Sequence, residues 1–146
     1  MVKDWLTRVA VCASISTLGV VVSAQDNLRT VWSGVFTDEQ AMRGQQTYIK
    51  TCGHCHRDDL TGGGSEVGAP ALRGPIFTYR WQDQPLSELF LTIGTTMPQN
   101  KPDSLTPQAV IDVVSFLLKA NEMPPGTVEL PAEVATLGKI RFIARP

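Results

Sequence analysis

Apolar residues recur at the spacing of an amphipathic helix in two segments of the second half of the chain. In the later segment, one face is formed by Val110, Val113, Val114, Leu117 and Leu118. Thr106 can cap this helix, and Pro107 suits its first turn. The helix should end near Asn121, ahead of Pro124.

A shorter stripe predicts another helix that starts at Pro85 and ends at Gly94. Its apolar face consists of Leu86, Leu89, Phe90 and Ile93. Proline is favoured in the first turn of a helix, and glycine commonly follows the last turn. The segment from Thr95 to Thr106 should then be a polar loop that contains Met97.

The first helix is predicted from its terminal signals. Thr37 followed by Gln40 matches a capping box, and the residues between them are acidic. This helix should run to about Lys50, with Met42 packed inside. Residues 57–75 contain repeated glycine and proline and are predicted to be loop, and residues 139–143 alone could form a strand. These patterns predict an all-α fold.

Residues 1–24 resemble a secretory signal. Lys3 and Arg8 precede an apolar run of about 14 residues, which is shorter than a membrane span. Small residues at Val22-Ser23-Ala24 offer a cleavage position, so Cys12 should be lost with the signal. The mature protein should be periplasmic, or anchored if the signal is not cleaved.

The charge balance gives no reason to expect a nucleic-acid or anionic-membrane partner. Without residues 1–24 the chain keeps 11 basic and 13 acidic residues, a net charge of −2. Its 122 residues make one domain.

The run Cys52-Gly53-His54-Cys55-His56 is the C-x-x-C-H motif that attaches a c-type haem. Two thiols one helical turn apart can add to the two vinyl groups of a haem and form thioethers. The imidazole that follows the second thiol can then bind the iron. The motif predicts one covalently bound haem.

The motif has two other possible interpretations. A thiol–disulfide oxidoreductase also uses C-x-x-C, but that motif normally follows a strand, whereas a helix is predicted before Cys52. A zinc site would need Cys52, Cys55, His54 and His56 together, because the mature chain has no other Cys or His. The haem interpretation is favoured over both.

The order of helix, C-x-x-C-H, glycine-rich loop, helix, Met-Pro and final helix resembles a class I, mitochondrial-type cytochrome c. The resemblance covers residues 37–121 and is closest to monohaem cytochromes and cytochrome modules that serve bacterial periplasmic dehydrogenases. It implies a cytochrome c fold in which three or more helices wrap around one haem.

The resemblance also implies roles for individual residues. Cys52 and Cys55 match the thioether cysteines, His56 the proximal iron ligand and Met97 the sixth ligand. Pro70 matches the proline whose carbonyl accepts a hydrogen bond from the proximal histidine. The family commonly has glycine directly before this proline, and Ala69 stands there in this chain.

Further positions follow from the same resemblance. Gly44 and Tyr48 match a glycine and an aromatic residue that pack on the last helix, here on Phe116. Arg80 and Trp81 are candidate donors to the haem propionates. Met123 is a competitor of Met97 for the iron, because it also precedes a proline.

These predictions divide the chain into a signal (1–24), a leader (25–36), a cytochrome c domain (37–122) and a C-terminal extension (123–146). The extension is too apolar for a disordered tail and should wrap the domain or dock on a partner. The expected function is electron transfer by a carrier with His/Met ligation that is not itself an enzyme. Its partners would be a dehydrogenase or an oxidase. The alternatives are an electron-accepting subunit of a periplasmic dehydrogenase and a haem enzyme with an open iron position.

Overall fold

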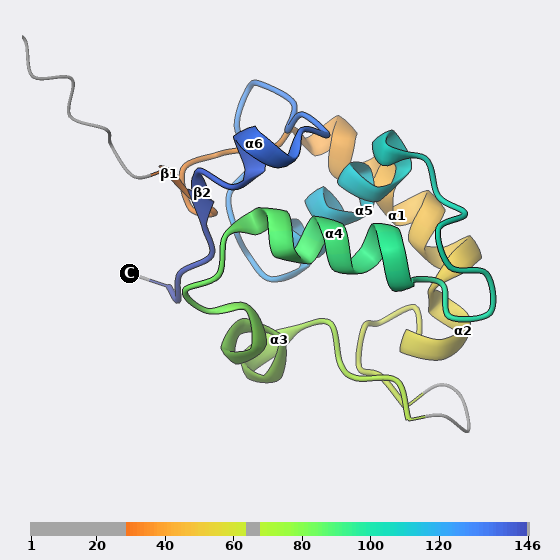
Figure 1. Cartoon of the computed structure of the whole chain (residues 1–146). Coiled ribbons are helices and arrows are strands. Elements are labelled where there is room, and N and C mark those ends of the chain that lie inside the picture. The colour runs from red at the N-terminus through yellow and green to blue at the C-terminus, as the bar shows by residue number, and fades with distance from the viewer. Residues whose placement is uncertain (1–28, 64–67, 146) are drawn as a thin grey trace, which may run out of the picture.

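Helices are the main regular elements of the chain, which is described over residues 29–63 and 68–145 of a computed structural model. The signal predicted for residues 1–24 lies outside these ranges. The elements in chain order are β1 (Arg29–Thr30), α1 (Asp38–Thr51), α2 (Gly53–His56), α3 (Gly74–Trp81), α4 (Leu86–Thr96), α5 (Pro107–Ala120), α6 (Val134–Leu137) and β2 (Ile140–Arg141) (Figure 1). In the described ranges the only sheet pairs β1 with β2 in parallel. The all-α prediction is confirmed.

Helices α1 and α5 cross at the centre of the fold with their backbones in close contact. A Cβ atom built on Gly44 of α1 would lie 1.8 Å from the carbonyl oxygen of Asp112 in α5. One turn later, the ring of Tyr48 packs on Phe116 with the ring centroids 5.2 Å apart. The predicted packing of Gly44 and Tyr48 on the last helix is therefore confirmed, because the small residue lets the helices approach and the aromatic pair fills the space beside it.

The predicted caps of α1 and α5 are present. The Thr37 hydroxyl accepts a hydrogen bond from the Gln40 amide at 3.1 Å, and the Thr106 hydroxyl accepts one from Ala109 at 3.2 Å. The prediction that Gln40 completes the capping box is wrong. The Gln40 side chain is fully buried and bonds to the backbone of Leu130 instead. The prediction that Met42 packs inside is also wrong, since its side chain is 51% exposed.

Two elements between the motif and α5 differ from the prediction. Gly94 does not end α4, which continues to Thr96, where the Thr95 and Thr96 hydroxyls donate to carbonyl groups one turn earlier. Helix α3 was not predicted at all. It begins in the segment expected to be loop, with Pro75 in its first turn, and buries Phe77 and Trp81 on one face.

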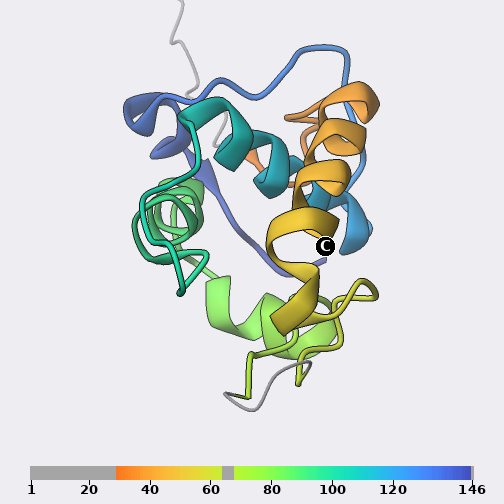
Figure 2. The same cartoon turned by 90° about the vertical axis from the view of Figure 1, so that its right-hand side faces the viewer.

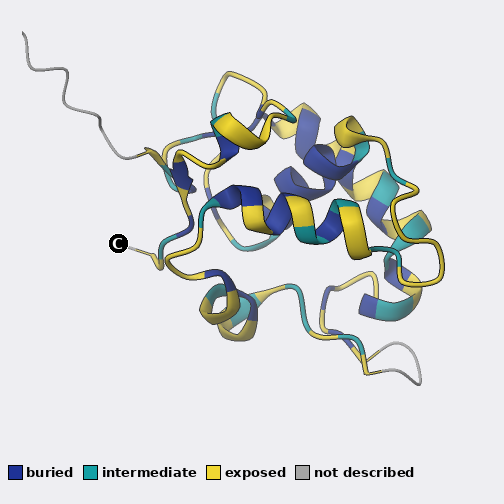
Figure 3. Ribbon diagram, viewed as in Figure 1, coloured by how far each residue is buried: buried dark blue, intermediate teal, exposed yellow. Residues whose placement is uncertain are grey.

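The C-terminal extension wraps the helices. Its apolar residues join the common core, including Met123, Leu130, Leu137, Ile140 and Phe142 (Figure 3). The ring of Phe142 meets that of Phe77 edge-on at 5.8 Å, so the extension also holds α3 in place. The leader takes part as well, because β1 pairs with β2 and the Gly126 amide donates to the Phe36 carbonyl at 2.6 Å.

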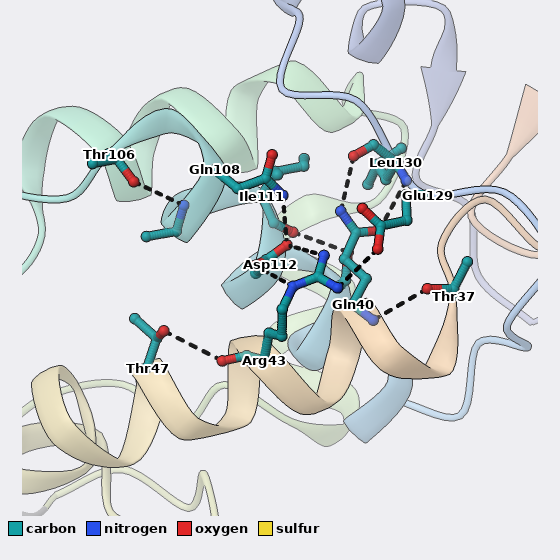
Figure 4. Close-up of polar contacts among 12 residues, drawn as sticks. Thr37, Gln40, Arg43, Thr47, Thr106, Gln108, Ile111, Asp112, Glu129 and Leu130 are labelled. Carbon is teal, nitrogen blue, oxygen red and sulfur yellow. Dashed lines mark hydrogen bonds and ion pairs between the residues drawn. The ribbon is translucent and has the colours of Figure 1, made fainter.

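Polar contacts attach the extension to α1 and α5. The Gln40 side-chain amide donates to the Leu130 carbonyl at 2.9 Å and accepts from the Leu130 amide at 2.8 Å (Figure 4). Arg43 forms a two-bond contact with the buried Asp112 and a 2.8 Å ion pair with Glu129 of the extension. These hydrogen bonds raise the pKa of the Arg43 guanidinium. Every buried side-chain polar atom of the described residues has a hydrogen-bond partner.

The close crossing of α1 and α5 makes a prediction about two glycines that both lie inside helices. We expect Gly44→Ala to lower the free energy of unfolding by ~2 kcal/mol or more, because the added methyl group would meet backbone that cannot move aside. Gly94→Ala is the control. Its Cβ would meet only Val110 at 3.8 Å, so the higher helix propensity of alanine should raise stability by ~0.5–1 kcal/mol. Denaturant unfolding measures both, and equal effects of the two variants would contradict the role of Gly44.

Candidate functional site

The C-x-x-C-H motif forms one closed helical turn at the end of α1. Cys52 ends α1 and begins α2, and its carbonyl accepts hydrogen bonds from the amides of Cys55 at 3.1 Å and His56 at 2.9 Å. Both thiols and the imidazole are therefore presented by the same short piece of rigid backbone. Cys52 and Cys55 are half-buried and do not form a disulfide.

The chain turns sharply directly after the motif. Arg57 and Leu60 both adopt a positive φ, of 61° and 62°, which a non-glycine residue adopts only when its surroundings hold it there. The Tyr48 hydroxyl donates to the Arg57 carbonyl at 2.8 Å and supports this turn. Burial raises the pKa of Tyr48, so the phenol stays neutral and remains a donor. Nothing in the sequence around Arg57 signals this contact.

His56 is the best defined side chain of the site. It is only 7% exposed, and its Nδ1 atom lies 2.8 Å from the carbonyl oxygen of Pro70. This is the contact that the family resemblance implies, and it forms although Ala69 stands where the family has glycine. With Nδ1–H donating to the carbonyl, Nε2 is the nitrogen available to a metal.

The two candidate sulfur ligands have different surroundings. Met97 is half-buried and caps the carboxyl end of α4, at the same end of the molecule as α2 (Figure 1). Met123 is 3% exposed and lies in the core beyond α5, beside a cavity also lined by Trp32 and Asn121. Met97 therefore follows directly from α4, whereas Met123 belongs to the core after α5, and ligation of an iron by either sulfur stays a prediction.

Arg80 and Trp81 lie together at the carboxyl end of α3. The Arg80 guanidinium carbon is 4.7 Å from the centre of the Trp81 ring, and Arg80 is exposed whereas Trp81 is buried. In Figure 2, α3 lies below and between α4 on one side and α1 with α2 on the other. The contact of Arg80 and Trp81 with haem propionates stays a prediction.

His54 is exposed to solvent, as expected for the residue between the two cysteines.

The two alternative uses of the motif find little support in the geometry. Within residues 29–63 and 68–145, no group of three or more Cys, His, Asp and Glu side chains comes together as a zinc site requires. The motif follows a helix and not a strand, which also disfavours a disulfide-exchange site. Burial raises the pKa of the Cys52 thiol, whereas disulfide exchange depends on a thiol whose pKa is lowered.

The donor set fits a c-type haem. Two cysteines on one turn suit two thioethers, and His56 presents Nε2 with its other nitrogen already bonded. Met97, directly after α4, stays the predicted second ligand.

No helix of the described segments is long and apolar enough to cross a membrane.

A protein-family model described as cytochrome C oxidase, cbb3-type, subunit III matches residues 39–117, which is more than half of the chain. The match begins in α1 and ends in α5, so it includes the motif, the Pro70 segment and Met97. No curated protein matches the chain, and no solved structure matches it either.

The Tyr48 contact makes a prediction with a defined pH dependence. We expect Tyr48→Phe to cost ~0.5–1.5 kcal/mol at pH 7, because the Arg57 carbonyl loses its donor. A phenol with a raised pKa in the folded state stabilises the fold at low pH, and this contribution disappears as pH rises above the usual value of about 10. The stability difference between wild type and variant should therefore shrink from pH 7 to pH 11.

Urea unfolding at both pH values measures this difference. Tyr79→Phe is the matched control at pH 7, since Tyr79 is 85% exposed and its loss should leave stability unchanged. A Tyr48→Phe variant as stable as wild type at pH 7 would show that the hydroxyl does not support the turn.

Proposed function

This chain belongs to the family of c-type cytochromes whose model it matches, and on that premise we propose that it is a periplasmic carrier of single electrons with His56 and Met97 as its axial iron ligands. Family membership implies a c-type haem and supports a role in electron transfer. Beyond family membership, we propose the two axial ligands, the periplasmic location and the redox partners.

The observation that carries the proposal is the hydrogen bond between His56 and the Pro70 carbonyl. It selects one tautomer, orients the ring and makes the other nitrogen a better ligand. A covalently held haem requires a histidine with a fixed tautomer and ring orientation, on the same turn as two cysteines. The haem supplies the chemistry when bound, by cycling between its ferric and ferrous states.

The remaining residues have supporting roles in this proposal. Cys52 and Cys55 hold the haem by thioether bonds, and Met97 closes the second axial position. A His/Met ligand pair places the reduction potential on the high side for haem. Arg80 and Trp81 would donate hydrogen bonds to the propionates at the end of α3.

Ligation by Met97 is also the reason to propose a carrier and not an enzyme. With both axial positions filled by the protein, oxygen or a substrate has no position on the iron. A haem enzyme with an open position is the alternative, and it requires Met97 to be away from the iron.

The location and partners are proposed from the sequence and the family. Residues 1–24 would direct export, and haem attachment fits an exported protein. The family description names a subunit of an oxidase, and a dehydrogenase or an oxidase could exchange electrons with the same haem. The extension packs on the chain's own helices, so a stable place in a dehydrogenase complex would need another surface.

Absorption spectra of the purified mature protein, oxidised and then reduced, test the proposal. We expect sharp α and β bands after reduction and a weak sulfur-to-iron band in the oxidised form. Carbon monoxide should bind the reduced protein poorly. Ready binding of carbon monoxide would favour the open-site enzyme, and a colourless protein with two titratable thiols would favour the dithiol alternative.

Replacement of single methionines identifies the sulfur ligand. We expect Met97→Ala to abolish the sulfur-to-iron band, to lower the reduction potential and to let carbon monoxide bind, because the thioether favours the ferrous iron. Met123→Leu is the control, since it conserves volume in the core and should leave the band unchanged. The reverse pattern would assign the ligand to Met123.

A further inference from the structure

The segment that carries Pro70 is bonded through its backbone to the turn after the motif. The Gly63 amide donates to the Ala69 carbonyl at 2.8 Å, and the Leu72 amide donates to the Leu60 carbonyl at 2.9 Å. These two bonds bracket Pro70. The turn itself is anchored to the motif, because the Gly62 amide donates to the His56 carbonyl at 3.0 Å.

Gly62 lies directly against the peptide group of Pro70. A Cβ atom on Gly62 would come within 2.6 Å of the Ala69 carbonyl oxygen and of the Ala71 nitrogen, and within 2.7 Å of the Pro70 carbonyl carbon. All three are backbone atoms, which cannot rotate away as the end of a side chain can. The Pro70 carbonyl can therefore stand 2.8 Å from His56 only if residue 62 has no side chain.

We propose that Gly62 is a positioning residue for the axial ligand His56, and that it acts by setting the Pro70 carbonyl at hydrogen-bond distance from Nδ1. This inference rests on the proposed function, in which His56 binds the haem iron. The hydrogen bond increases the electron donation of the imidazole and so stabilises the ferric iron. A side chain at residue 62 displaces the carbonyl, weakens the bond and raises the reduction potential.

The neighbouring glycine provides a matched control. Gly62 and Gly63 both have a positive φ, of 75° and 69°, so alanine meets an unfavourable φ at either position. Among the described residues, no atom lies within 4 Å of a Cβ built on Gly63. The two substitutions therefore share a positive φ and differ in the contact with the Pro70 peptide.

The test uses the full, haem-loaded protein as wild type, Gly62→Ala and Gly63→Ala. NMR of the reduced protein measures the solvent exchange of the His56 Nδ1 proton, and a redox titration measures the potential. We expect exchange about tenfold faster and a higher potential in Gly62→Ala, since tenfold corresponds to the loss of one hydrogen bond of ordinary strength. Gly63→Ala should match wild type in both, although both variants lower the unfolding free energy.

Equal exchange rates and potentials in the two variants would overturn the inference. If wild type lacks the spectrum of a His-ligated haem, the proposed function fails. If wild type has that spectrum and Gly62→Ala leaves the proton and the potential unchanged, only the inference fails.

If Gly62→Ala does not incorporate haem, a second pair of variants that disturbs the turn less provides the test. Asp59 accepts hydrogen bonds from the Thr61 amide and hydroxyl, at 3.1 and 2.7 Å, and so shapes the turn before Gly62. Asp59→Ala should speed the exchange of the His56 proton by a smaller factor. Glu39→Ala removes a carboxylate of the same charge from an exposed position in the first turn of α1 and should not. Equal exchange in these two variants would likewise overturn the inference.

Discussion

The close contact between α1 and α5 is the constraint on which the rest of the structure depends. Gly44 allows the two backbones to meet, and the pair of Tyr48 and Phe116 fixes the angle beside it. Because α1 leads directly into the C-x-x-C-H turn, this crossing also determines where the motif is presented. Tyr48 takes part in both the helix crossing and the motif turn, since its ring packs on α5 and its hydroxyl supports the turn after His56.

The C-terminal extension turns a small helical domain into one with a larger core. It supplies both backbone partners of the buried Gln40. It also supplies Glu129 to the Arg43–Asp112 pair and Phe142 to the ring of Phe77. A domain of fewer than 100 residues buries a limited apolar surface, so these contacts matter for stability. Because Phe142 holds α3, the extension also supports Arg80 and Trp81, the candidate propionate donors.

Backbone groups hold His56 and the turn that follows it. Its partner is a carbonyl, that carbonyl is held by amide–carbonyl pairs on both sides, and the turn beneath it is closed by further backbone bonds. Such contacts are insensitive to pH and keep their geometry when side chains move. In the proposed function, an iron bound by His56 would change its oxidation state with little movement of this ligand, which suits fast transfer of single electrons.

The sequence alone determined the helices with strong periodicity, the caps at Thr37 and Thr106, and the chemistry of residues 52–56, because these depend on local spacing and residue type. It also identified Pro70 as the partner of His56 and Phe116 as the partner of Tyr48, through the resemblance to a family. Only the tertiary structure decided where Gln40 bonds, that α4 continues past Gly94, that α3 is a helix and that the extension wraps the domain. Each of these outcomes is set by segments far apart in the chain, whose packing outweighs the local preference of glycine to end a helix or of glutamine to complete a cap.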